Sequence, residues 1–137
     1  MAWDICVVEP QPVEPDYFKA LSYLALKQRR RSLVVIFTDL TSGLSLNSLV
    51  AQVSLLAHHS LPLVVTISDP DVFAAAHQSP NNSQAVYQRA VAVQVLERRM
   101  VLETLQKRGV MTLDVPANQL STAVINRYLE LKGRTLL

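Results

Sequence analysis

The amino-acid sequence predicts an α/β domain in which a parallel sheet is flanked by helices. Three short apolar runs carry this prediction, at Leu33–Phe37, Leu63–Ile67 and Val110–Leu113. Each run is rich in β-branched residues and none alternates apolar with polar side chains, which is typical of strands covered on both faces. The segments between the runs show helical spacing, so strands and helices are expected to alternate along the chain.

The 137 residues are expected to form a single domain, with residues 1–14 as an extended lead-in segment. No linker, internal repeat or low-complexity tract interrupts the chain. A domain of this length buries a real core.

The first helix is expected over Pro15–Arg30, since proline suits a first turn and Asp16 complements the positive end of the helix dipole. Tyr17, Leu21 and Leu24 then share one face. Basic residues gather at the other end: Lys27, Arg29, Arg30 and Arg31. Cations there complement the dipole, and a phosphate- or acid-binding patch is the alternative.

The second helix is expected over Ser45–His58. Its apolar positions recur at spacings of three and four: Leu46, Leu49, Val50, Val53 and Ala57. His58 and His59 close the helix, and adjacent histidines point in different directions. We therefore expect them to cap the C-terminus rather than to form a metal site with His77.

Further helices are expected after the second strand. Pro70 opens a short helical turn, and the sequence "SPNNS" breaks it. A long helix is expected over Ser83–Arg108, with Gly109 as its C-terminal cap. Its buried side is expected to hold Val86, Ala90, Val93, Met100 and Val101. A last helix, Gln119–Lys132, is expected to bury Leu120, Val124, Tyr128 and Leu131.

Composition argues against several classes of partner and location. A net charge of +2 and an aromatic content of 6% do not suit a nucleic-acid binder. The single cysteine, Cys6, cannot form an internal disulfide, which favours a cytoplasmic location. The most apolar segment, Leu44–Ala57, is too short to span a bilayer, which takes about 20 apolar residues. We expect no membrane insertion by this chain, although a longer parent protein could be membrane-associated.

Three aspartates stand where ligands bind in open parallel sheets, beyond the carboxyl ends of the strands. Asp39, Asp69 and Asp114 each follow one of the apolar runs. Three carboxylates on one rim would suit a hard cation such as Mg²⁺, and hydroxyls beside Asp39 would add oxygens: Thr38, Thr41 and Ser42. The alternative is that these aspartates end strands and cap the following helices.

The stretch "LVVTISDPDVF" also resembles the first motif of haloacid-dehalogenase-type phosphatases. That resemblance implies Asp69 as the nucleophile and Asp71 as the acid/base. The family also needs a downstream lysine and an acidic pair on later strands. Only one strand is expected after the motif, and it offers Asp114 alone.

A wider resemblance covers the chain from about Val13 onward. The pieces "VEPDYFKALSYL", "RRRSLVVIFTDL", "HHSLPLVVTISDPDV", "YQRAVAVQVLERRMVLETLQKRGVMTLDVP" and "INRYLELKGR" resemble the C-terminal part of the bacterial family called domain of unknown function fifty-eight. That family is similar to von Willebrand factor type A domains. The resemblance implies the second half of a doubly wound fold, holding its fourth, fifth and sixth strands.

Type A domains bind a metal through three loops, and the third supplies an aspartate after the fourth strand. Asp39 in "FTDL" matches that position, but Leu40 stands where a glycine is usual. The other two loops, one of them Asp-x-Ser-x-Ser, have no counterpart. The resemblance therefore implies a vestigial metal ligand at Asp39, no cofactor in this chain, and Mg²⁺ only in a full-length parent.

The same resemblance implies a non-catalytic protein–protein interaction module rather than an enzyme. Its partner would be a protein, with a MoxR-type AAA ATPase system as the candidate. An α/β fragment without activity is the alternative. The resemblance also leaves the outer edge of Leu33–Phe37 without its neighbouring strand, so we expect a homodimer. Either two edges would pair, or "AWDICVV" would fold back as a substitute strand, or both would occur by swapping.

Overall fold

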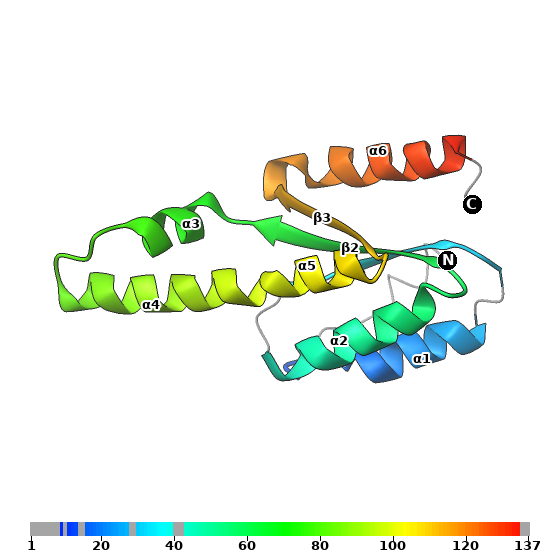
Figure 1. Ribbon diagram of the computed structural model, residues 1–137, viewed down its shortest axis with the longest axis horizontal. Helices are drawn as coiled ribbons and strands as arrows, with labels where there is room; N and C mark the ends of the chain where they lie inside the picture. The colour runs from blue at the N-terminus through cyan, green and yellow to red at the C-terminus, as the bar shows by residue number, and fades with distance from the viewer. Residues whose placement is uncertain (1–8, 10, 14–15, 28–29, 40–42, 135–137) are drawn as a thin grey trace.

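The structure is a computed structural model of the chain, and it describes residues 9, 11–13, 16–27, 30–39 and 43–134. Within them, three parallel strands form one sheet in the order β1-β2-β3. The strands are β1 (Leu33–Phe37), β2 (Leu61–Ser68) and β3 (Met111–Pro116). Helices lie on both faces of the sheet (Figure 1). This confirms the predicted α/β class and is consistent with a Rossmann-like or type A-like arrangement.

β1 has the predicted bounds, whereas β2 and β3 extend further than their apolar runs. β2 is the central strand, and its pairing with β3 continues as far as Ser68, which lies opposite Pro116. This pairing carries β3 past the run Val110–Leu113 and through Asp114. The predicted end of the third strand is therefore wrong, because ladder pairing rather than hydrophobicity decides where it stops.

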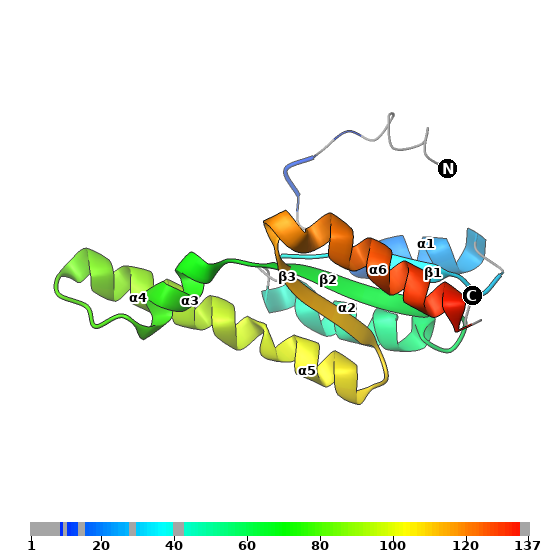
Figure 2. The same ribbon diagram turned by 90° about the horizontal axis from the view of Figure 1, so that it is seen from above.

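One face of the sheet carries the main core. Three helices cover this face (Figures 1 and 2): α1 (Tyr17–Lys27), α2 (Gly43–Leu56) and α5 (Met100–Lys107). Leu21 of α1, Leu49 and Val53 of α2, and Leu105 of α5 belong to one buried cluster with Ile36 of β1. The apolar stripe predicted for the second helix is confirmed, and each such side chain contributes about 1.5–3 kcal/mol when buried.

The opposite face is covered by one helix, α6 (Leu120–Gly133), which follows the 3-10 turn η2 (Ala117–Gln119). Leu131 is buried as predicted, and Leu120 and Val124 are half-buried. Tyr128 is 39% exposed, so its predicted burial is wrong. A single helix does not cover three strands, and Phe37 of β1 is accordingly 60% exposed on this face.

Two helices project beyond the sheet as an arm, clearly seen in Figure 1. They are α3 (Pro70–His77) and α4 (Ser83–Arg98), and we call residues 70–98 the α3–α4 arm. α3 is a complete helix rather than the expected single turn. Asn82 caps α4 by accepting a hydrogen bond from the Ala85 N–H at 2.7 Å.

The predicted long helix Ser83–Arg108 is interrupted at Arg99, between α4 and α5. There the N–H of Arg99 bonds the Leu96 carbonyl three residues back, which tightens the turn. The predicted buried side is also wrong over most of its length: Val86, Ala90, Val93 and Met100 are exposed, and only Val101 packs on the core. Periodicity locates an apolar face, but α4 lies past the sheet and, among the described residues, packs mainly against α3.

Several expectations fall outside the described residues. They concern most of the lead-in segment, including "AWDICVV", together with Cys6, Pro15, Arg29, Leu40, Thr41 and Ser42. No helix in the described part of the chain has both the length and the apolar character needed to cross a membrane.

Candidate functional site

The three predicted aspartates line one depression of about 380 Å³ at the carboxyl edge of the sheet. Asp39 follows β1, Asp69 follows β2, and Asp114 belongs to β3. Arg99 lines the same depression, as does Phe73 from the base of the α3–α4 arm. With three carboxylates and one guanidinium, this rim is acidic.

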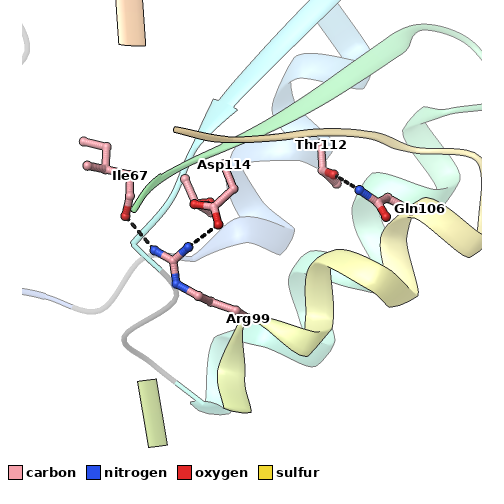
Figure 3. A network of polar contacts seen from close by, with 6 residues as sticks. Ile67, Arg99, Gln106, Thr112 and Asp114 are labelled. Carbon is pink, nitrogen blue, oxygen red and sulfur yellow. Dashed lines mark hydrogen bonds and ion pairs between the residues drawn. The ribbon is translucent and has the colours of Figure 1, made fainter. Parts of the chain in front are cut away.

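Arg99 and Asp114 form an ion pair that joins the helical break to β3 (Figure 3). The Arg99 Nη2 group also donates to the Ile67 carbonyl at 2.7 Å, so one guanidinium holds both neighbouring strands. The other Asp114 oxygen, Oδ1, accepts from the buried Thr66 hydroxyl at 2.9 Å. Both carboxylate oxygens of Asp114 are therefore engaged within the fold.

Sequence reasoning placed Asp114 correctly near this edge but missed Arg99 and Thr66. The expectation that Asp114 lies beyond the end of its strand is wrong, because it pairs with Thr66 inside the ladder. Arg99 stands in an apparently continuous helical pattern. Its contact with Asp114 depends on the packing of α5 alongside β3. Gln106 of α5 and Thr112 of β3 are joined by a 2.5 Å hydrogen bond in the same packing (Figure 3).

Asp69 caps α3. Its Oδ1 accepts from the N–H of Asp71 at 2.9 Å, and its backbone carbonyl accepts from the N–H of Val72 at 3.2 Å. Pro70 occupies the first helical turn, where its missing N–H leaves no bond unmade. This is the capping role that the sequence offered as the alternative to metal binding.

Asp39 lies two residues beyond β1, is exposed and lines the depression. The preceding residue, Thr38, is buried: its N–H bonds the Val65 carbonyl at 3.0 Å, and its hydroxyl lies 2.7 Å from the Tyr17 hydroxyl. The Thr38 side chain is thus directed to α1. Sequence reasoning assigned Tyr17 to the core only, since an apolar stripe does not reveal a polar contact with a strand end.

The described rim residues do not fit Mg²⁺. No group of three or more His, Cys, Asp or Glu side chains among the residues described is arranged to hold a metal ion. The Arg99 guanidinium already sits against the Asp114 carboxylate, and a divalent cation there would meet a fixed positive charge. Asp69 is committed to its helix cap. Asp39 alone cannot organise an octahedral shell.

The histidines are not brought together. His58 and His59 are exposed in the turn after α2, where their N–H groups bond the carbonyls of Leu55 and Leu56. α2 ends at Leu56, two residues before its predicted end. His77 lies in α3, with its Nδ1 at 2.9 Å from the Phe73 carbonyl. Its ring centroid is 4.3 Å from that of Phe73, with the two ring planes tilted by 31°.

Two apolar grooves lie elsewhere on the body of the domain. One, of about 940 Å³, runs between α1 and α2 beside the two histidines. The other, of about 650 Å³, lies between β1 and α6. It is lined by Leu33 and Val35 of the strand and by Val124, Ile125 and Tyr128 of the helix, with Arg31 and Lys132 among its lining residues. We call it the β1–α6 groove.

No protein-family model, no curated protein and no solved structure matches the chain.

Proposed function

We propose that this chain is a non-catalytic protein–protein interaction module that binds its partner through the α3–α4 arm. The observation that carries the proposal is the exposure of large apolar side chains on this arm. Tyr87 of α4 is 70% exposed and Phe73 of α3 is 60% exposed. Val86, Val91 and Val93 are exposed as well.

Apolar side chains that are exposed on a projecting element contribute little to the stability of the fold, and they are typical of surfaces that bind another protein. Gathered apolar surface is rare on monomeric proteins unless a partner covers it. Tyr87 combines an apolar ring with a polar tip, which suits a residue at an interface. The arm holds these residues on helices that pack on each other, so they are presented in a fixed geometry.

The acidic rim at the base of the arm supports the same reading. Asp114 and Asp69 already serve the fold, through Arg99 and through the α3 cap. Neither is left as an activated nucleophile or base, which favours a binding role over a catalytic one. Asp39 adds a negative charge at the rim. A partner that contacts the arm would bind more favourably if it presented basic residues to this acidic rim.

The resemblance to domain of unknown function fifty-eight suggests which partner to test. It implies a MoxR-type AAA ATPase system, with the metal-dependent site of type A domains reduced here to Asp39. In this proposal the metal plays no part in binding by this chain. Any Mg²⁺ site would require ligands in a full-length parent.

The experiment uses a photo-crosslinking amino acid at Tyr87, with the same group at Tyr23 as the control. Both side chains are exposed tyrosines on helices, but Tyr23 belongs to α1, away from the arm. We expect an adduct with a MoxR-type ATPase of the same genome from the Tyr87 position alone. Tyr87→Ser should weaken binding at least tenfold, as truncation of a buried interface aromatic does, and Tyr23→Ser should not. Equal crosslinking from both positions, or binding unaffected by Tyr87→Ser, would contradict the proposal.

A further inference from the structure

β1 is the edge strand of the sheet among the described residues, and its outer backbone groups can be assigned. The N–H of Thr38 bonds the Val65 carbonyl, and the carbonyl of Ser32 accepts from the Leu61 N–H. In a parallel ladder, every second residue of a strand directs its N–H and C=O groups to the same neighbouring strand. Thr38 and Ser32 are even-numbered and bond β2. The N–H and C=O groups of the odd-numbered residues Leu33, Val35 and Phe37 therefore face outward.

The side chains of the same three residues point to the less covered face of the sheet. Leu33 and Val35 line the β1–α6 groove, whereas Ile36 belongs to the core on the other face. Phe37 follows the same alternation and is exposed. Within the described part of the chain no strand pairs with these outward groups, and they lie next to an apolar groove. This is the combination that recruits another strand.

The charges at the two ends of β1 are opposite. Arg31 precedes the strand by two residues, and Asp39 follows it by two. If a second copy pairs antiparallel with Val35 opposite its own counterpart, Leu33 lies opposite Phe37 of the other copy. In the same register Arg31 lies opposite Asp39 of the other copy, and the two-fold axis repeats this pair at the other end.

We propose that two copies of this chain pair antiparallel along β1, centred on Val35, to form a continuous six-stranded sheet (twice the three strands of one copy). The register is set by three features together: outward N–H and C=O groups at Leu33, Val35 and Phe37, their apolar side chains, and the Arg31–Asp39 pairs. Phe37 of each copy then extends the apolar floor of the β1–α6 groove beside Leu33 of the other. This dimer does not involve the α3–α4 arm, so it is independent of the proposed function of the arm.

A charge-exchange experiment tests this register, because it separates pairing from folding. Arg31→Asp places Asp opposite Asp39, and Asp39→Arg places Arg opposite Arg31. Like charges directly opposite on antiparallel strands are unfavourable. The dimer dissociation constant of each variant alone should therefore be roughly tenfold higher than that of the unchanged chain. A one-to-one mixture of the two variants restores opposite charges at both ends and should form heterodimers. Sedimentation velocity from 1 to 100 μM measures all three samples.

Val35→Pro tests the backbone part of the proposal. The N–H of Val35 faces outward, so proline at this position removes a hydrogen bond to the second copy and none from the β1–β2 ladder. We expect this variant to be monomeric and to retain the far-ultraviolet circular dichroism of the unchanged chain. Tyr87→Ser, on the arm, should leave the dimer intact. A monomer at 100 μM for the unchanged chain, or a dimer insensitive to both charge variants, would overturn the proposal.

Discussion

The hydroxyl of Tyr17 lies 2.7 Å from the hydroxyl of Thr38, which ties the first turn of α1 to the end of β1. Thr38 is buried, and its backbone N–H is bonded to the central strand. This contact therefore attaches a helix to the strand end from which Asp39 enters the acidic rim.

Tyr17→Phe removes the phenol oxygen and leaves the Thr38 hydroxyl without this partner. We expect a loss of about 1 kcal/mol in the free energy of unfolding, the typical effect of one hydrogen bond. Urea denaturation followed by circular dichroism measures it. Tyr23→Phe is the matched control, because Tyr23 is exposed and its ring keeps the Lys27 ammonium that lies 5.6 Å from its centre. A loss of equal size in both variants would mean that the Tyr17–Thr38 bond has no special role.

Arg99→Leu should destabilise the fold by about 1–3 kcal/mol, since it removes the donor to Asp114 Oδ2 and to the Ile67 carbonyl, while the Thr66 hydroxyl still donates to Asp114 Oδ1. Arg99→Lys should recover only part of this loss, because an ammonium does not reproduce the planar fork of the guanidinium. Arg134→Leu is the control: it breaks an exposed pair with Glu130 and should cost about 0.5 kcal/mol or less. Thermal unfolding of the three variants ranks them, and a full recovery by lysine would refute the two-strand role of Arg99.

Gly109 and Gly133 give a matched pair of alanine substitutions. Gly109 ends the turn after α5 with a φ of +81°, and an added Cβ would meet nothing within 4 Å. Gly109→Ala should therefore cost about 1 kcal/mol through backbone conformation alone. Gly133 is the last residue of α6 and has the same open space around it, without a positive φ. Gly133→Ala should be neutral or slightly stabilising. The expected result in urea denaturation is therefore a loss of stability for Gly109→Ala and none for Gly133→Ala.

Isothermal titration calorimetry with Mg²⁺ and Mn²⁺ should give no saturable heat in the micromolar range. Asp114 is paired with Arg99 and Thr66, and Asp69 caps α3. Asp39 would add one carboxylate, and a single carboxylate does not organise the shell that Mg²⁺ requires. Asp39→Asn should leave the titration unchanged. A micromolar dissociation constant abolished by Asp39→Asn would show that the metal site is not vestigial.

Hydrolysis of p-nitrophenyl phosphate tests the phosphatase alternative at Asp69 and Asp71. We expect no activity above background, because Asp69 Oδ1 is engaged as the cap of α3. Asp69→Asn should keep most of the stability, since asparagine caps helices about as well as aspartate. Activity in the unchanged chain that disappears in this folded variant would favour the enzyme.

Local patterns predicted most of the elements that hold the rim. The run "LVVIF" matches β1 residue for residue, and the stripe of α2 is buried as predicted. Both depend on neighbours close in sequence, so periodicity is enough to locate them. The position of Asp69 as a helix cap was likewise visible, since an aspartate before proline at the start of a helix is a local signal.

The rim itself was only partly predictable. That Asp39, Asp69 and Asp114 share one edge follows from parallel strands, and the structure places them around one depression. The ion pair of Asp114 with Arg99 does not follow, because the two residues meet through the packing of α5 on β3. The homodimer and the partner stay predictions.

By itself, the sequence determined the alternation of strands and helices, the parallel sheet and the apolar stripe of α2, because these depend on residue preferences and periodicity within single segments. Only the tertiary structure decided that β3 runs on through Asp114, that Arg99 breaks the long helix to hold two strands, and that α4 leaves Val86 and Val93 uncovered. The physical reason is that ladder length, ion pairing and burial are set by what lies opposite each residue. For these residues the opposite group comes from a distant part of the chain, or, on α4, is absent among the described residues.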